Sequence, residues 1–162
     1  MVAGQNSKLG VGDAAPDFEL PTQSGETVRL SDYHGKSIVV LYFYPRDYSP
    51  GCTAEACAFR DSYEVFSDAG AEVIGISSDA VRSHERFAER HRLPFVLASD
   101  VGGRTQRRYG VSTRLGLLPG RVTFVIDRQG VVRHAFSSMT NISAHVDRAL
   151  EVVKELRAEP AP

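Results

Sequence analysis

Residues 42–61 read YFYPRDYSPGCTAEACAFRD and decide the fold of this chain. The stretch begins in an apolar run, 37–44, whose β-branched and aromatic residues are typical of a central strand covered on both faces. It then passes a loop that contains proline and glycine and enters a helix at Cys52. In α/β proteins, functional sites lie where strands end and helices begin, so this junction is the first place to look for chemistry.

The flanking sequence continues the alternation of strands and helices. Apolar runs predict strands at 71–77, 95–98, 122–126 and 131–136, and helical spacing predicts helices at 53–69, 81–91, 103–109 and 142–156. Ser24-Gly25 lies between strand-like segments 17–20 and 27–30, which predicts an N-terminal β-hairpin. The order predicts an α/β sandwich with a mixed central sheet flanked by helices, because the last two strands form a hairpin.

Composition and length describe an ordinary globular protein. The 162 residues are 42% hydrophobic and 24% charged, with a formal net charge of -1, so neither nucleic acid nor a membrane surface is an expected partner. We expect a single domain over 1–162, with flexible ends at 1–12 and 157–162. The first residues lack the apolar segment of a secretion signal, so a cytoplasmic location is expected.

The chain has two cysteines, Cys52 and Cys57. A zinc site would need further ligands, and no histidine lies at ligand spacing from this pair, so no metal site is predicted. Residues five apart in a regular helix have Cα atoms about 8–9 Å apart, beyond the reach of a disulfide. A bond between the two sulfurs therefore requires the helix to unwind, which indicates a redox switch. Packing roles for both cysteines stay open on this reasoning alone.

The position of Cys52 favours a reactive sulfur. A helix N-terminus presents unpaired N–H groups and partial positive charge, and both stabilise a thiolate. Gly51 allows the backbone to come close because it has no side chain. Glu55 suits the first helical turn either as a dipole partner or as part of a site. Tyr44 suits either the core or the lining of a pocket, and the five histidines are interpreted as structural or solvated.

Residues 45–52 resemble the peroxiredoxin motif P-x-x-x-T/S-x-x-C, and 42–61 as a whole is similar to the Q-type peroxiredoxins, also called the bacterioferritin comigratory protein group. Residues 118–130 resemble the arginine-bearing strand and hairpin of that family, and 13–18 resemble its N-terminal opening. The resemblance implies a thioredoxin-like sandwich and a thioredoxin-dependent peroxidase with an atypical two-cysteine mechanism. Such an enzyme reduces hydrogen peroxide or organic hydroperoxides without a metal, haem or flavin.

The resemblance also implies roles for particular residues. Cys52 matches the peroxidatic cysteine, whose sulfenic acid would condense with the resolving cysteine at Cys57. The catalytic set would be completed by Pro45, Ser49 and Arg121, and the peroxide would be bound by Ser49, Cys52, Glu55, Arg121 and Tyr44. A thioredoxin-type donor would reduce the disulfide, and family members of this type are often monomers.

Two other functions fit the cysteines. A thioredoxin-like disulfide carrier would react slowly with peroxide, although its usual spacing is C-x-x-C and this chain has C-x4-C. A redox sensor would be oxidised at Cys52 without sustained turnover.

Overall fold

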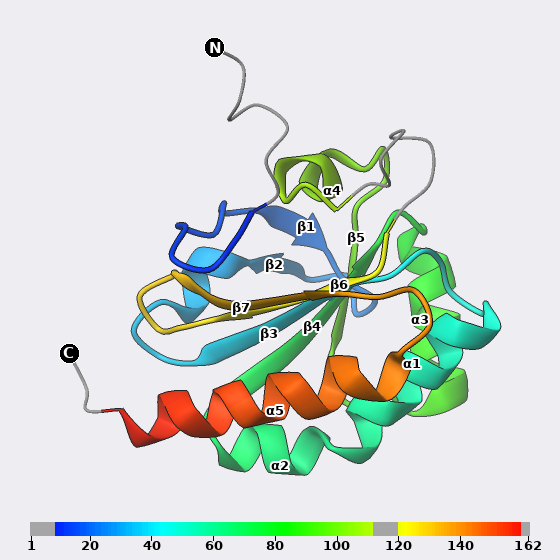
Figure 1. Cartoon of the computed structure of the whole chain (residues 1–162). Helices are drawn as coiled ribbons and strands as arrows, with labels where there is room; N and C mark the ends of the chain where they lie inside the picture. The colour runs from blue at the N-terminus through cyan, green and yellow to red at the C-terminus, as the bar shows by residue number, and fades with distance from the viewer. Residues whose placement is uncertain (1–8, 112–119, 160–162) are drawn as a thin grey trace.

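A computed structural model describes residues 9–111 and 120–159, and Figure 1 shows its arrangement. Five strands form the main sheet in the order β5-β4-β3-β6-β7. The central strand is β3 (Ile38–Phe43). On one side of it, β4 (Ala71–Ser77) pairs parallel with β3, and β5 (Val96–Ser99) pairs parallel with β4. On the other side, β6 (Val122–Ile126) pairs antiparallel with β3, and β7 (Val132–Ser137) pairs antiparallel with β6. The predicted mixed sheet is confirmed.

The centre of the sheet is the strand that the apolar run predicted. All six residues of β3 are buried. Because side chains alternate along a strand, Val40 and Tyr42 enter the core on one face, while Leu41 and Phe43 enter the core on the other. A strand with two buried faces has to be apolar at every position, which is why the sequence is continuous rather than alternating.

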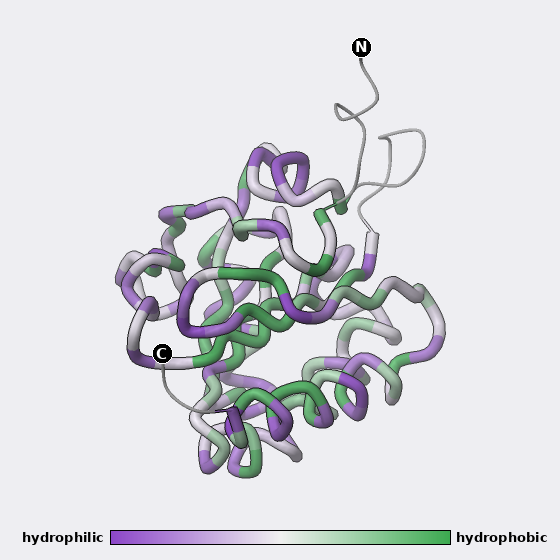
Figure 2. Tube along the Cα trace, turned by 60° about the vertical axis from the view of Figure 1, so that its left-hand side comes forward, coloured by the Kyte–Doolittle hydropathy of each residue, from purple (hydrophilic) through white to green (hydrophobic). Residues whose placement is uncertain are grey.

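Helices and a small hairpin cover the two faces of the sheet (Figure 1). One face carries α1 (Pro50–Asp61), α2 (Tyr63–Asp68), α3 (Val81–His91) and α5 (Ile142–Ala158). The other carries the hairpin of β1 (Glu19–Pro21) and β2 (Thr27–Arg29), a 3-10 turn (Leu30–Tyr33) and α4 (Arg104–Arg108). Hydrophobic residues follow the strands between these layers in Figure 2. No helix among the described residues is long and apolar enough to cross a membrane.

The helix expected at 53–69 differs from the prediction at its start and in its middle. It begins three residues earlier, at Pro50, because proline is well suited to the first helical position. It also breaks at Ser62, whose backbone (φ -101°, ψ 2°) leaves the helical region and separates α1 from α2. Cys52 is consequently the third residue of α1, within its first turn, as the sequence indicated.

Parts of the two segments expected to be flexible, 1–12 and 157–162, make defined contacts. The backbone N–H of Gly12 donates to the carbonyl of Val132, and Leu9 packs against the core on the hairpin side. At the other end, α5 continues to Ala158. Residues 1–8 and 160–162, and positions 118 and 119 of the arginine-bearing motif, lie outside the described residues.

Gly75 leaves room in the sheet for the large ring of Tyr42. Gly75 of β4 pairs with Tyr42 of β3. A Cβ atom at Gly75 would lie 2.8 Å from the Tyr42 ring and 2.9 Å from a methyl group of Leu97. The Tyr42 ring, stacked on Phe59 of α1 at a centroid distance of 4.5 Å, therefore needs glycine on the neighbouring strand.

Candidate active site

The sulfur of Cys52 lies in the first turn of α1, where the loop from β3 enters the helix. Its side chain is fully buried, and the thiol is free. Ser49 is the N-cap residue, and its carbonyl accepts the N–H of Thr53 as the first bond of the helix. The Ser49 side chain makes no capping bond. The start of α1 therefore retains unpaired N–H groups close to the sulfur.

Arg121 brings a positive charge to that sulfur. It directly precedes β6, which pairs with β3, so its guanidinium reaches the start of α1 from a position 69 residues further along the chain. Its Nη2 atom donates to Cys52 Sγ at 3.4 Å, and its Nη1 atom donates to Glu55 Oε1 at 2.6 Å. Its Nε atom donates to the carbonyl of Met139 at 3.2 Å. A guanidinium fixed at three points thus places a positive charge and a hydrogen-bond donor beside the Cys52 sulfur.

Burial and ion pairing have opposing effects on Arg121. Burial alone would lower its pKa, but the charges of Glu55 and Cys52 and their hydrogen bonds outweigh burial and raise it. The guanidinium therefore stays positively charged while it is only 4% exposed. A positive charge therefore lies beside the Cys52 sulfur.

Gly51 is required by the closeness of this contact. A Cβ atom on Gly51 would lie 3.0 Å from Arg121 Nη2, tighter than ordinary packing. The guanidinium thus occupies the space that a side chain at position 51 would need. This geometry confirms the sequence-based expectation that glycine before Cys52 allows a close approach.

Glu55 is a buried carboxyl group placed between Arg121 and a histidine. Its burial raises its pKa from 4.5 to about 7, although the Arg121 charge opposes that rise. One oxygen is bonded to Arg121; the other, Oε2, has no hydrogen-bond partner and lies 3.6 Å from Nδ1 of His145. Glu55 is thus paired with the same guanidinium that contacts Cys52, in addition to its place near the start of the helix.

His145 and Thr123 extend this group and were missed by the sequence analysis. The Nε2–H group of His145 donates to the carbonyl of Ser138 at 2.7 Å, and its Nδ1 atom lies 2.7 Å from Thr123 Oγ1. Burial is the main cause that lowers the pKa of His145, so its neutral form is favoured and Thr123 donates to Nδ1. His145 was interpreted as structural or solvated, and neither residue belongs to a local motif. Only the pairing of β6 with β3 and the packing of α5 bring them together.

The loop that leads from β3 into α1 contains Tyr44, Pro45 and Ser49, whose side chains have different surroundings. The hydroxyl of Ser49 donates to the carbonyl of Arg46 at 3.3 Å, within the loop itself. Pro45 is half-buried. The hydroxyl of Tyr44 donates to Asp47 at 2.6 Å. Tyr44 was expected to help bind peroxide; its hydroxyl is instead engaged with Asp47, which supports a role in holding the loop.

Cys57 lies in the same unbroken helix as Cys52. It is half-buried and free, and its Sγ atom lies 3.9 Å from Nδ1 of His91 at the end of α3. The two sulfurs are therefore held apart by helix α1, as the five-residue spacing indicated.

Residues 11–135 of this chain match the AhpC/TSA family. The chain belongs to the AhpC/TSA family. Within it, the chain is 49% identical over 150 residues to the chloroplastic peroxiredoxin Q of Triticum aestivum, covering 92% of this chain and 69% of the relative. It is 50% identical over 149 residues to the chloroplastic peroxiredoxin Q of Arabidopsis thaliana, covering 91% and 68%. The predicted membership of the Q-type peroxiredoxins is confirmed.

Solved structures of AhpC/TSA relatives share the fold. Peroxidoxin BcpB from Mycobacterium tuberculosis matches with a TM-score of 0.86 and 42% identity, covering 93% of this chain and 99% of that protein. The bacterioferritin comigratory protein of Xanthomonas campestris, described for its alkyl peroxide reduction activity, matches with a TM-score of 0.81 and 29% identity, covering 92% and 98%. The sandwich is thus the thioredoxin-like fold of peroxiredoxins, and the protein is a thiol peroxidase.

One expectation is overturned by the same AhpC/TSA relatives. A cytoplasmic location was expected because the sequence shows no secretion signal. The curated relatives are chloroplastic peroxiredoxins Q, which contradicts that expectation. The lack of a secretion signal could not settle the location, because it does not distinguish a cytoplasmic protein from one directed elsewhere.

Proposed function

We propose that Cys52 is the sulfur that attacks the peroxide and Cys57 the sulfur that resolves the product. The observation that carries this assignment is the 3.4 Å contact from Arg121 Nη2 to Cys52 Sγ at the start of α1. It combines a fixed cation with a helix N-terminus at one sulfur, and Cys57 has neither. The substrates are hydrogen peroxide and organic hydroperoxides.

The first step is a displacement at the peroxide bond. The Cys52 thiolate attacks one oxygen, the O–O bond breaks, and the other oxygen leaves as hydroxide or alkoxide and takes up a proton. Arg121 stabilises the thiolate and can donate to the charge that develops on the oxygens. Ser49 can join it once its hydroxyl turns from the carbonyl of Arg46, and Pro45 shields the sulfenic acid from water. The product is sulfenic acid at Cys52.

The second step forms a disulfide within the chain. The Cys57 thiolate attacks the Cys52 sulfur, an S–S bond forms, and the S–O bond breaks, so that hydroxide leaves and takes up a proton from solvent to form water. Because α1 keeps the two sulfurs apart, its first turns unwind before this step. A thioredoxin-type dithiol then reduces the disulfide by exchange and becomes oxidised itself. We propose that the enzyme acts as a monomer.

The experiment that tests this proposal is peroxide turnover coupled to thioredoxin and thioredoxin reductase, on wild type, Cys52→Ser and Cys57→Ser. We expect Cys52→Ser to be inactive. Cys57→Ser should consume about one equivalent of peroxide and then stop or over-oxidise. Normal cycling of Cys57→Ser with thioredoxin would refute the resolving role.

The same assay separates the two other functions. A disulfide carrier would show a peroxide reaction no faster than that of an ordinary thiol. A sensor would show fast oxidation of Cys52 but no sustained turnover. Size-exclusion chromatography with light scattering of the reduced and oxidised protein tests the monomeric state.

A further inference from the structure

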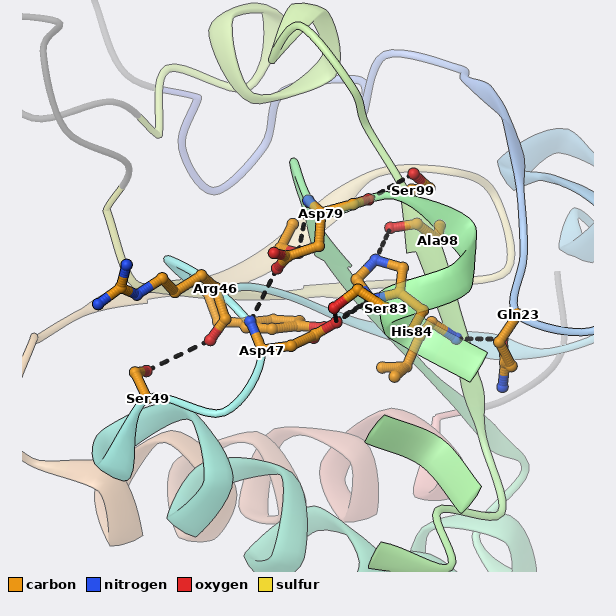
Figure 3. Close-up of polar contacts among 12 residues, drawn as sticks. Gln23, Arg46, Asp47, Ser49, Asp79, Ser83, His84, Ala98 and Ser99 are labelled. Atoms are coloured by element: carbon orange, nitrogen blue, oxygen red, sulfur yellow. Dashed lines mark hydrogen bonds and ion pairs between the residues drawn. The ribbon is translucent and has the colours of Figure 1, made fainter. Parts of the chain in front are cut away.

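A cluster of polar side chains joins the loop between β3 and α1 to helix α3 (Figure 3). We call it the Asp47 cluster; it comprises Tyr44, Asp47, Asp79, Ser83 and His84. Asp47 Oδ2 lies 2.8 Å from His84 Nδ1 and accepts the hydroxyl of Ser83 at 2.7 Å, while Oδ1 accepts the hydroxyl of Tyr44 at 2.6 Å. The backbone N–H of Asp47 donates to Asp79 Oδ2 at 2.7 Å. Asp47 thus ties the loop between β3 and α1 to the end of β4 and to α3.

His84 is a hydrogen-bonded partner of Asp47. Its Nε2 atom lies 3.1 Å from the carbonyl of Ala98, and its Nδ1 atom faces the Asp47 carboxylate. A carbonyl only accepts hydrogen bonds, so Nε2 donates to Ala98, and Nδ1 shares a hydrogen bond with the Asp47 carboxyl group. The side chains of this pair are 0% and 1% exposed. Replacing a buried pair of this kind by apolar side chains is often neutral for stability, so we look for its effect in the geometry that it fixes.

The cluster is better satisfied by hydrogen bonds than by a metal. Ligand atoms of Asp47, Asp79 and His84 lie within 4.8 Å of one another, the arrangement of a possible cation site. However, the oxygens facing this space already accept from Ser83, Ser77 and the Asp47 backbone. Nδ1 of His84 is likewise engaged, with Asp47 Oδ2 at 2.8 Å. The structure therefore supports an anchor rather than a metal centre.

α3 contacts the reactive segment at both of its ends. Near its N-terminus, it holds the loop through Ser83 and His84, and the ring of Tyr48 packs edge-on against Phe87 at a centroid distance of 5.1 Å. Tyr48 adopts a φ of 68°, a conformation that non-glycine residues rarely take without a fixed environment. At its C-terminus, α3 reaches Cys57 through His91, whose carbonyl also accepts from Arg60 of α1 at 2.8 Å.

We propose that the Asp47–His84 pair is a positioning pair that holds the loop 45–49, and with it the first turn of α1, in the peroxide-reactive form. This inference rests on the proposed function, because it assigns the control of that same site. The pair restrains unwinding of α1, so it increases the rate of peroxide attack and decreases the rate of disulfide formation. Asp47 and His84 act through the loop and do not touch the reacting atoms.

The test measures the two rates separately by rapid quenching and mass spectrometry of Cys52. Asp47→Asn removes the charge with little change in shape, and His84→Leu removes both ring contacts. We expect each to slow sulfenic acid formation about tenfold and to speed disulfide formation several-fold, because each removes a charge-assisted hydrogen bond. Less Cys52 should then reach sulfinic acid at high peroxide. His84→Asn, which keeps a donor near the Nδ1 position, should lie closer to wild type.

Two controls separate positioning from general destabilisation. Val132→Ala opens a cavity on the opposite face of the sheet, where Val132 is fully buried. It should lower the urea midpoint without changing the ratio of the two rates. Ser83→Ala removes one hydrogen bond to Asp47, keeps the contact of Asp47 with His84, and should change the ratio in the same direction by a smaller factor.

Two results would overturn the inference. If wild type forms the sulfenic acid rapidly but Asp47→Asn and His84→Leu keep its rate ratio within twofold, the pair has no positioning role while the proposed function stands. If wild-type Cys52 reacts with peroxide only as an ordinary thiol does, the proposed function fails and the inference fails with it.

Discussion

Gly51→Ala should impair the peroxide reaction although it introduces a better helix-forming residue. The new Cβ atom would lie 3.0 Å from Arg121 Nη2, so the guanidinium has to retreat by a few tenths of an ångström to reach ordinary contact distance. That nitrogen is the one that donates to Cys52 Sγ at 3.4 Å, so its retreat weakens this contact. Weakening one charge-assisted hydrogen bond by about 1.4 kcal/mol corresponds to a tenfold slower reaction.

The stability of this variant should change in the opposite direction. Alanine is favoured over glycine in a helix by up to about 1 kcal/mol, so the free energy of unfolding should stay equal or rise. Stopped-flow measurement of peroxide consumption gives the rate. The rate at which iodoacetamide alkylates Cys52 in a Cys57→Ser background reports the thiolate form of Cys52. This rate should be lower in the Gly51→Ala variant at neutral pH.

Gly10→Ala is the matched control, because a Cβ atom at Gly10 would meet nothing closer than 3.9 Å. It should leave both the peroxide rate and the alkylation rate unchanged. A Gly51→Ala protein that reacts with peroxide as fast as wild type would refute the reasoning, since the Arg121 contact would then contribute nothing to the reactivity of Cys52.

Three further changes test the same geometry. Arg121→Lys keeps the charge but cannot contact Cys52, Glu55 and the Met139 carbonyl together, so peroxide consumption should slow more than tenfold; an unchanged rate would show that charge alone suffices. Between pH 4.5 and about 7, Glu55 keeps its proton in the folded protein but loses it in the unfolded chain. The free energy of unfolding should therefore fall by up to about 3 kcal/mol as pH rises through that range. Urea unfolding of Glu55→Gln should lack this fall, and an identical pH profile would exclude Glu55 as its source. Gly75→Ala forces a methyl group against the Tyr42 ring at 2.8 Å and should lower the free energy of unfolding by about 1–3 kcal/mol, measured in urea; a loss below 0.5 kcal/mol would show that the ring moves freely.

Elements whose signals are local could be predicted from the sequence. The bounds of β4 and α3 agree with the prediction to the residue, because an apolar run with a glycine before it and an amphipathic segment are complete signals in themselves. The break at Ser62 could not be predicted, because the apolar spacing of Phe59, Tyr63 and Phe66 continues through it. Only the backbone shows that the helix restarts there.

The candidate site divides in the same way. Cys52, Gly51 and Ser49 belong to one continuous motif, so their neighbourhood follows from the sequence. His145, Thr123 and the pair of Asp47 with His84 depend on contacts between segments 22 to 37 residues apart, and a histidine carries no local sign of its partner. Polar groups that become buried through tertiary packing are therefore the part of the site that sequence patterns do not reveal.

On the proposed mechanism, the chemistry itself releases the helix. The first turn of α1 lacks a side-chain cap, so the contact of Arg121 with the Cys52 thiolate is, beside its contact with Glu55, one of the attractions that hold it. Oxidation converts the thiolate to a neutral sulfenic acid, so the attraction between the Arg121 charge and a negative sulfur is lost. This loss comes just before the step for which the helix has to unwind. The Asp47–His84 anchor is untouched by this change, because it lies beyond the reacting atoms. The two restraints therefore act at different stages: Arg121 responds to the oxidation state of the sulfur, whereas the anchor sets how far the loop yields once that response has occurred.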